Sequence, residues 1–233
     1  MGTPDSETMR PGGFLLAATT SELRREPEVR GVADLVEFRM DTATDPITQL
    51  ESYDGDLPLI ATNRPQWEGG NAPDAGRVDR LVEASGFEAV ELVDVELETA
   101  RGDDSPVSAL RENGVEVICS HHDFEETPST ERLTELIEAC SRFGDVAKVA
   151  TFSGDQGGTL RMLSALYETT EQGHRVAALA MGADGSLSRV LAPFYGSALG
   201  YATLQSDDEE YAPGQLPIHT LASLVGSLEE SCG

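Results

Sequence analysis

The chain has 233 residues, of which 42 are Asp or Glu and 16 are Lys or Arg, so its formal charge at pH 7 is −26. A surface this acidic repels the phosphates of nucleic acids and of anionic membranes. Both are excluded as partners, because a protein binds them through clustered Lys and Arg residues. Hydrophobic residues make up 39% of the chain, which is enough for one well-buried core and excludes a disordered acidic tail.

Short apolar runs alternate along the chain with polar stretches that suit helices, a pattern typical of parallel α/β proteins. We expect strands at residues 14–20, 35–41, 58–64, 87–97, 116–123, 145–152, 174–182 and 197–204. We expect helices at residues 21–30, 45–53, 76–85, 104–113, 129–142, 157–172, 184–193 and 215–229. These strand–helix units predict an α/β fold of the (β/α)₈ TIM barrel type, a single domain over residues 13–233. Residues 1–12 lack the pattern and are expected to form a flexible N-terminal arm.

The main alternative fold is an open doubly wound sheet, which usually carries a phosphate-binding glycine fingerprint after its first strand. Here the first expected strand runs into TTSELRRE, and the chain contains neither GxGxxG nor GxxxxGK[ST]. The sequence therefore favours the barrel and predicts no nucleotide cofactor.

Cysteine and histidine spacing bears on the compartment and on metals. Cys119, Cys140 and Cys232 are widely spaced without a CxxC pair, which argues against a disulfide framework or a cysteine zinc site and favours a reducing cytoplasm. The four histidines show no HExxH spacing, so we predict no metal. No signal-peptide core stands at the N-terminus, and no run approaches the roughly 20 apolar residues that span a bilayer.

Lysine occurs once, as Lys148, against fifteen arginines, although lysine is normally among the commonest residues. An acid excess with lysine nearly absent predicts a protein that stays soluble in concentrated salt, where the Debye length shrinks to about 3 Å. We infer a salt-accumulating microbe as the source.

The second expected strand carries three charges in the stretch VEFRMD. Glu37, Arg39 and Asp41 alternate with apolar residues, so they share one face of the strand. Charges on a core face are costly unless they pair or bind a polar ligand. The pattern predicts either a rim network of ion pairs or contacts to a polar substrate.

Two further segments place polar side chains after strands, where the catalytic face of a barrel lies. The third expected strand ends in NRPQWEGG, which supplies Arg64 and Glu68. The stretch MGADGSLSR follows the seventh and supplies Arg189, whose guanidinium could bind a carboxylate bidentately.

Two histidines stand at the end of the fifth expected strand, in SHHDFEETPS. Strand alternation sends His121 and His122 to opposite faces, so at most one should point into the barrel mouth. That one is a candidate general base, and the alternative is a structural histidine.

Lys148 lies in the apolar stretch DVAKVATF, with its side chain on the same face as Val146 and Ala150. A lysine that snorkels from a strand edge is the alternative to a functional one. A chain that avoids lysine elsewhere but keeps one in an apolar strand favours a requirement for its amine, which can form a Schiff base with a ketone or aldehyde. Attack requires the neutral amine, and we expect burial and nearby cations to lower its pKa.

Taken together, these segments resemble type I 3-dehydroquinate dehydratase. The matching pieces occur in order across nearly the whole chain: VEFRMD, NRPQWEGG, SHHDFEETPS, VAKVAT, MGADGSLSRVLAPFYGSALGYATL and YAPGQLP. The resemblance implies a (β/α)₈ barrel, a homodimer without metal or organic cofactor, and the removal of water from 3-dehydroquinate to give 3-dehydroshikimate in the shikimate pathway. With the acidic composition, it points to a halophilic archaeon.

The resemblance also implies a role for each matching residue. It makes Lys148 the Schiff-base lysine, His122 the general acid/base and Glu68 the carboxylate that orients this histidine. It implies that three residues contact the substrate hydroxyls or shape the site: Glu37, Arg39 and Arg64. It implies that Arg189 and Gln215 bind the substrate carboxylate and close a loop over it. Tyr211 stands where the family commonly has serine, in SAPGQ, and is not assigned to the site.

Two other functions fit part of the pattern. A class I aldolase also combines a barrel with a Schiff-base lysine, but it would require a phosphate site late in the barrel. A catalytically silent barrel that serves as a binding module would have no reason to keep the sole lysine.

Overall fold

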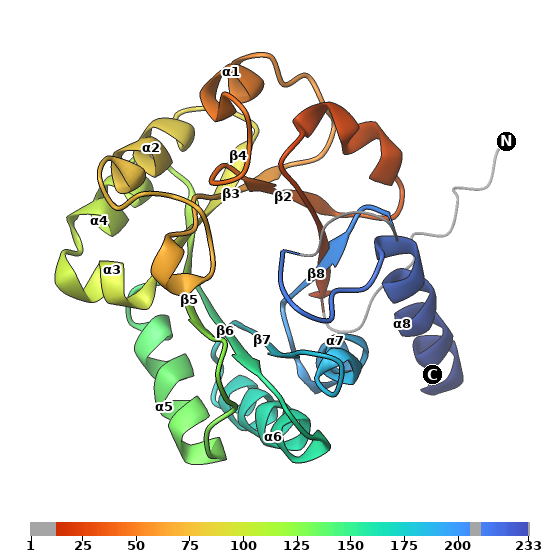
Figure 1. Cartoon of the computed structure of the whole chain (residues 1–233). Helices are drawn as coiled ribbons and strands as arrows, with labels where there is room; N and C mark the ends of the chain where they lie inside the picture. The colour runs from red at the N-terminus through yellow and green to blue at the C-terminus, as the bar shows by residue number, and fades with distance from the viewer. Residues whose placement is uncertain (1–12, 206–210, 233) are drawn as a thin grey trace, which may run out of the picture.

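The computed structural model describes residues 13–205 and 211–232, which form a (β/α)₈ barrel in which a ring of helices surrounds the strands (Figure 1). The strands are β1 (Leu15–Thr20), β2 (Leu35–Arg39), β3 (Leu59–Thr62), β4 (Val90–Glu96), β5 (Glu116–Asp123), β6 (Val146–Phe152), β7 (Val176–Met181) and β8 (Leu199–Thr203). The α-helices are α1 (Pro46–Glu51), α2 (Arg77–Ala84), α3 (Leu97–Gly102), α4 (Ser105–Glu112), α5 (Thr130–Ser141), α6 (Gln156–Glu171), α7 (Ser186–Leu191) and α8 (Ile218–Cys232). Three 3₁₀ helices accompany them: η2 (Leu23–Val29), η3 (Gln66–Glu68) and η4 (Ala192–Tyr195).

The eight strands are parallel and follow the chain order around the barrel, with β8 paired to β1. The seam between β7 and β8 is closed more loosely, by an isolated parallel bridge between Val176 and Ser197. The Ala198 N–H donates to the Val176 carbonyl there at 2.7 Å. The predicted (β/α)₈ fold is confirmed.

The structure contains the expected helices and strands, with their ends shifted by a few residues. It differs from the expectation in type at two places. The expected helix at residues 21–30 is a 3₁₀ run with Pro27 inside it, a residue that lacks the N–H needed for a regular α-helix. The expected strand at 87–97 ends at Glu96, and Leu97 begins the helix α3, which the sequence reading missed. The expected N-terminal arm, residues 1–12, lies outside the described residues.

Side chains cap two of the longest helices. The Ser129 hydroxyl accepts from the Arg132 N–H at the start of α5, and the Asp155 carboxylate accepts from the Gly158 N–H at the start of α6. These contacts satisfy amide groups that have no partner within the helix. They fix where the β5 and β6 loops end, and therefore help to position the face on which the candidate site lies.

Apolar side chains pack on both sides of the strands. Outward residues such as Phe38 and Val149 lie in clusters with the surrounding helices. Inward residues at the N-terminal end of the barrel, including Leu35, Ile60 and Ile118, form a separate central cluster. This central cluster fills the barrel below the polar cavity described in the next section. Within the described part of the chain, no helix is both long enough and apolar enough to cross a membrane.

Candidate active site

On several strands the inward face changes from apolar to polar toward the C-terminal end, whereas on β7 it stays apolar. On β2 the inward residues are Leu35, Glu37 and Arg39, and on β6 they are Val146 and Lys148. This change follows from the period of two in a strand, which keeps alternate residues on one face. The result is a buried polar cavity above an apolar floor, lined by Glu37, Arg39, Thr62, Arg64, Glu68, Gly69, His122, Phe124, Lys148, Ala150, Leu179, Arg189, Tyr201, Tyr211, Ala212 and Gln215.

Lys148 lies inside this cavity and is only 5% exposed. Its Nζ is 2.9 Å from Asp94 Oδ2 and 3.4 Å from Glu37 Oε1. It also lies 4.0 Å from the centre of the Tyr201 ring, in a cation–π contact. The sole lysine therefore points inward and does not snorkel to solvent from a strand edge.

The expected direction of the lysine pKa shift is wrong. Burial does oppose the ammonium charge, but Asp94, Tyr201 and Glu37 together outweigh it and raise the pKa of Lys148 above its ordinary value. Since the two carboxylates lie on β4 and β2, opposite the lysine across the barrel, the local sequence around Lys148 contains no sign of them. The amine rests as an ammonium and must lose a proton before it can act as a nucleophile.

Arg64 occupies the centre of a buried group of carboxylates. Its guanidinium lies 2.7 Å from Asp94, 2.8 Å from Glu96 and 3.4 Å from Glu68. It also donates to the Ser120 hydroxyl at 2.7 Å. These contacts raise the pKa of Arg64 and lower that of Asp94, whose charged form is stabilised by Arg64 and then by Lys148.

The sequence reading missed Asp94 and Glu96, although a signal was present. The stretch VDVE in β4 alternates apolar and acidic residues in the same way as VEFR in β2. Both carboxylates are fully buried. A buried Arg77 from α2 contacts the second oxygen of Glu96 at 2.6 Å, which extends the charged network to the outer layer.

His122 and Glu68 form a pair beside the lysine. The Nδ1 atom of His122 lies 2.9 Å from Glu68 Oε2. Glu68 ends the short helix η3, and the chain reverses at Gly69, which has a φ of 77°. A Cβ at Gly70 would lie 2.1 Å from the Arg64 carbonyl oxygen, so the motif NRPQWEGG needs glycine there to bring Glu68 back over the barrel.

Burial and neighbouring charges shift both members of this pair. Burial lowers the pKa of His122 well below its ordinary value, with Arg64 and Lys148 adding to the effect. Burial also raises the pKa of Glu68 to about 8, opposed by Arg64. His122 is therefore neutral at pH 7 and can accept a proton. Its Nε2 is free for that purpose only when Nδ1 carries the hydrogen, which an ionised Glu68 favours.

The two adjacent histidines differ as strand alternation predicts. His122 lines the cavity, whereas His121 does not. His121 is 3.9 Å from the other oxygen of Glu68, and burial lowers its pKa. The candidate acid/base is thus His122.

The remaining expected site residues lie at the rim of the cavity. Arg39 forms a bidentate pair with Asp41, with both distances at 2.8 Å, and lies over the Tyr211 ring at 4.9 Å. Arg189 donates to the backbone carbonyls of Tyr201 and Pro213. Arg39 and Asp41 therefore form the ion pair that the charge pattern of VEFRMD allowed.

The segment YAPGQ folds over the rim of the cavity. The Gln215 side-chain oxygen accepts from the N–H groups of Tyr211 and Ala212, at 2.8 and 3.3 Å. Gln215 thus shapes this turn, and the turn places the Tyr211 ring in the cavity lining. All eight expected site residues line this one cavity, together with Tyr211, which the sequence reading left unassigned.

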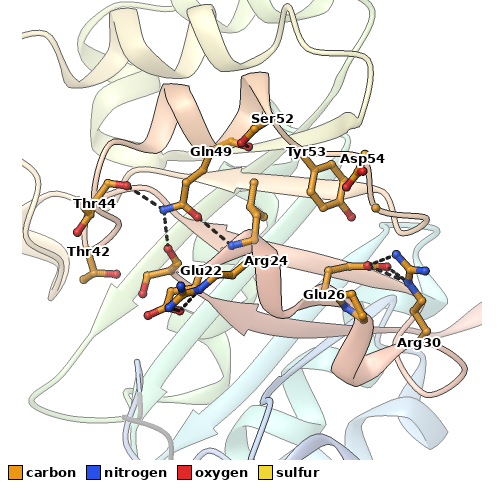
Figure 2. A pocket seen from close by; sticks show the side chains of 14 residues that line it. Glu22, Arg24, Glu26, Arg30, Thr42, Thr44, Gln49, Ser52, Tyr53 and Asp54 are labelled. Carbon is orange, nitrogen blue, oxygen red and sulfur yellow. Dashed lines mark hydrogen bonds and ion pairs between the residues drawn. The ribbon is translucent and has the colours of Figure 1, made fainter.

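A larger depression lies apart from this cavity, between the segments that follow β1 and β2 (Figure 2). Its charged side chains pair with one another: Glu26 with Arg30 at 2.7 Å and Glu22 with Arg24 at 2.7 Å. Gln49 bridges it by hydrogen bonds to backbone atoms. The depression contains no lysine or histidine, so it offers no nucleophile or general base of the kind found in the barrel.

Among the described residues, no group of three or more His, Cys, Asp or Glu side chains is arranged to hold a metal ion. The carboxylates nearest to one another in the cavity instead contact Arg64 and Lys148.

Comparison with known proteins identifies the family. The sequence model of the family described as Type I 3-dehydroquinase matches residues 15–231. The chain belongs to this family. The 3-dehydroquinate dehydratase of Haloarcula marismortui is 45% identical over 222 residues, covering 93% of this chain and 96% of that protein. The enzyme of the same name from Halobacterium salinarum is 42% identical, covering 93% and 98%.

Solved structures agree with this assignment. The crystal structure of 3-dehydroquinate dehydratase from Geobacillus kaustophilus superposes with a TM-score of 0.83 at 26% identity, covering 94% of this chain and 92% of that one. A type I 3-dehydroquinate dehydratase from Clostridium difficile, solved with covalently modified comenic acid, gives a TM-score of 0.83 at 25% identity and covers 95% and 93%. The predicted family is confirmed, and relatives at 41–45% identity come from the halophilic archaea Haloarcula, Halobacterium and Haloquadratum.

Proposed function

We propose that this protein is a 3-dehydroquinate dehydratase, a hydro-lyase of the shikimate pathway that works through a Schiff base on Lys148. The observation that carries the proposal is the placement of the only lysine in the chain. Its amine is buried in the barrel, in one cavity with the pair His122–Glu68. The proposed substrate is 3-dehydroquinate and the product is 3-dehydroshikimate, in agreement with the names of the archaeal relatives.

The proposed reaction begins with Lys148 as an ammonium. Nζ passes one proton to neutral His122 and then attacks the ring ketone, which forms a C–N bond and moves the C–O π pair to oxygen. That oxygen takes one proton from nitrogen and one from His122 and leaves as water. The product of this step is an iminium ion, and His122 is neutral again.

Water loss from the ring follows from the iminium ion. His122 removes the proton from the carbon next to the iminium, which acts as an electron sink, and the enamine forms. The electron pair of the enamine then expels the ring hydroxyl, which takes the same proton from His122 as it leaves. Hydrolysis of the product imine frees the lysine. Glu68, 2.9 Å from Nδ1, orients the imidazole throughout.

The other cavity residues are proposed to hold the substrate. Glu37, Arg39 and Arg64 contact its hydroxyl groups or shape the cavity, and Glu37 also keeps Lys148 in place at 3.4 Å. Arg189 binds the substrate carboxylate, and Gln215 holds the YAPGQ turn over it. Arginine suits this role because its planar guanidinium can donate two hydrogen bonds to one carboxylate.

The decisive experiment compares wild type with Lys148→Ala in concentrated KCl. Wild type should convert 3-dehydroquinate to the conjugated enone, seen by ultraviolet absorbance, and borohydride with substrate should leave a reduced adduct on the protein, seen by intact mass. Lys148→Ala should remain folded but lose turnover by several orders of magnitude and form no adduct. Retained turnover in this variant would exclude the Schiff-base mechanism. A Schiff-base aldolase would trap its substrate in the same way but would cleave a C–C bond, and family membership favours the dehydratase.

We further propose a cytoplasmic homodimer adapted to high salt. Exposed apolar side chains gather on neighbouring elements of one side, α6, α7 and η4, in a chain whose surface is otherwise strongly acidic. They are Leu160, Tyr167, Leu187 and Tyr195. Sedimentation of a monomer at micromolar concentration in 3 M KCl would exclude the dimer. A melting temperature that does not fall when KCl is removed would exclude the salt adaptation.

A further inference from the structure

Tyr201 carries a buried hydroxyl group that no other described residue satisfies. The residue lies on β8, is 4% exposed, and forms part of the lining of the cavity that holds Lys148. Its hydroxyl oxygen has no hydrogen-bond partner of ordinary geometry within the described residues, although the Lys148 amine is near enough to lower its pKa. A buried hydroxyl without a partner costs free energy, and phenylalanine would fill the same space without that cost.

The position of the ring indicates where the missing partner belongs. The Lys148 Nζ lies 4.0 Å from the centre of the Tyr201 ring. The carbonyl carbon of a substrate must come within bonding distance of this nitrogen. The oxygen on that carbon, one bond further on, can then approach the Tyr201 hydroxyl, which sits at the edge of the same ring.

We propose that Tyr201 is a catalytic residue whose hydroxyl group donates a hydrogen bond to the ketone oxygen of the substrate while Lys148 attacks the ketone carbon. The inference rests on the proposed Schiff-base function and adds a residue to it. As the C–N bond forms, the C–O π pair moves to oxygen, and a donor placed at that oxygen stabilises the growing negative charge. The tyrosine keeps its own proton. The two protons that the oxygen gains before it leaves as water come from the lysine nitrogen and from His122, as in the mechanism above.

The state of the phenol agrees with a donor role. Burial raises the pKa of Tyr201 above its ordinary value, with nearby Lys148 opposing this effect. The hydroxyl group therefore keeps its hydrogen at neutral pH. The backbone of the same residue is also held in place, because its carbonyl oxygen accepts from Arg189 at 3.5 Å and its strand pairs with β1 at Ala17.

The test removes only this hydroxyl group, by Tyr201→Phe, and keeps the ring that contacts the ammonium. Turnover and borohydride trapping of 3-dehydroquinate by wild type establish whether the proposed function holds, and the comparison of the two proteins then tests the hydroxyl alone. We expect kcat/KM to fall by about 10²-fold, the lower end for loss of one oxyanion donor. The rate at which borohydride traps the adduct should fall in parallel. The melting temperature without substrate should stay the same or rise, since an unsatisfied polar group is gone.

A substrate deuterated at the carbon that loses its proton gives a second measurement, the isotope effect on kcat/KM. A purely structural role of Tyr201 would leave this isotope effect unchanged. If imine formation has become the slow step in Tyr201→Phe, the isotope effect on kcat/KM should shrink toward one relative to wild type. The matched control is Tyr53→Phe, which removes a hydroxyl that lies outside the cavity and donates to the Leu57 carbonyl, and it should leave kcat/KM, trapping and the isotope effect unchanged. A kcat/KM within about twofold of wild type, or a slower turnover with unchanged trapping and an unchanged isotope effect, would overturn the proposal.

Discussion

Arg64 should be the most sensitive charged residue of the cavity to substitution, because three buried carboxylates depend on it. Arg64→Gln keeps a side chain that can donate hydrogen bonds but removes the positive charge beside Asp94, Glu96 and Glu68, at 2.7, 2.8 and 3.4 Å. Removal of one partner from a buried ion pair leaves an uncompensated charge, and this typically costs about 3–5 kcal/mol.

The expected loss is smaller than three such costs, because each carboxylate retains another partner. Asp94 keeps Lys148 at 2.9 Å, Glu96 keeps Arg77 at 2.6 Å, and Glu68 keeps its contact with His122. At an effective dielectric constant of about 20, one pair of unit charges 4 Å apart contributes about 4 kcal/mol. We therefore expect the free energy of unfolding to fall by about 4 kcal/mol, a large part of the roughly 5–15 kcal/mol of an ordinary domain.

Urea unfolding of both proteins at the same high KCl concentration measures this loss. Arg101→Gln serves as the control, since Arg101 pairs with Glu98 at 2.8 Å on the surface and such pairs contribute about 0.2–1 kcal/mol. Arg64 lowers the pKa of Asp94 and opposes the raised pKa of Glu68, so both pKa values should rise without it, and the deficit should increase as the pH rises and shrink as the pH is lowered. An unfolding free energy of Arg64→Gln within about 1 kcal/mol of wild type, the range of a surface pair, would refute the central role of this guanidinium.

Two further predictions concern the pair His122–Glu68. His122→Ala should still form the imine, trapped by borohydride, but lower turnover by about 10²- to 10⁴-fold, the usual contribution of a general acid/base; an unchanged steady-state rate would exclude this role. Because burial raises the pKa of Glu68 to about 8 and its ionised form leaves Nε2 of His122 free to accept a proton, kcat/KM of wild type should increase as the pH rises through about 8. Glu68→Gln should lack this rise, and a variant with the same pH profile as wild type would contradict the assignment.

The sequence predicts the barrel and most of the cavity because both depend on periods that are local in the chain. Alternation alone places Glu37, Arg39 and Lys148 on inward faces, and the C-terminal rule of barrels places Arg64 and His122 at one end. The structure agrees with both inferences. The sequence does not predict Tyr201 as a site residue, because a tyrosine in an apolar strand resembles an ordinary core residue. Only the structure shows that its hydroxyl lacks a partner among the described residues.

The pKa of Lys148 depends on contacts between distant segments, which local sequence patterns do not predict. Its two carboxylate partners stand 54 and 111 residues earlier in the chain, and they meet the lysine only because the barrel closes. The flanking apolar residues predict burial, and burial and nearby cations both lower a lysine pKa. The closed sheet brings Asp94 and Glu37 across the interior and reverses the sign.

The buried charges around Lys148 nearly balance one another, although the chain as a whole is strongly acidic. The connected network contains four carboxylates and three cations: Glu37, Glu68, Asp94 and Glu96 with Arg64, Arg77 and Lys148. With a pKa of about 8, Glu68 is mostly protonated at neutral pH, which leaves three negative and three positive charges. Loss of the Lys148 proton to solvent would leave the buried network with a net negative charge, which a low-dielectric interior disfavours. Transfer of that proton to His122 keeps the net charge of the cavity constant through imine formation, and because Nε2 accepts the proton only while Glu68 is ionised, this step should proceed mainly at a pH above the pKa of Glu68.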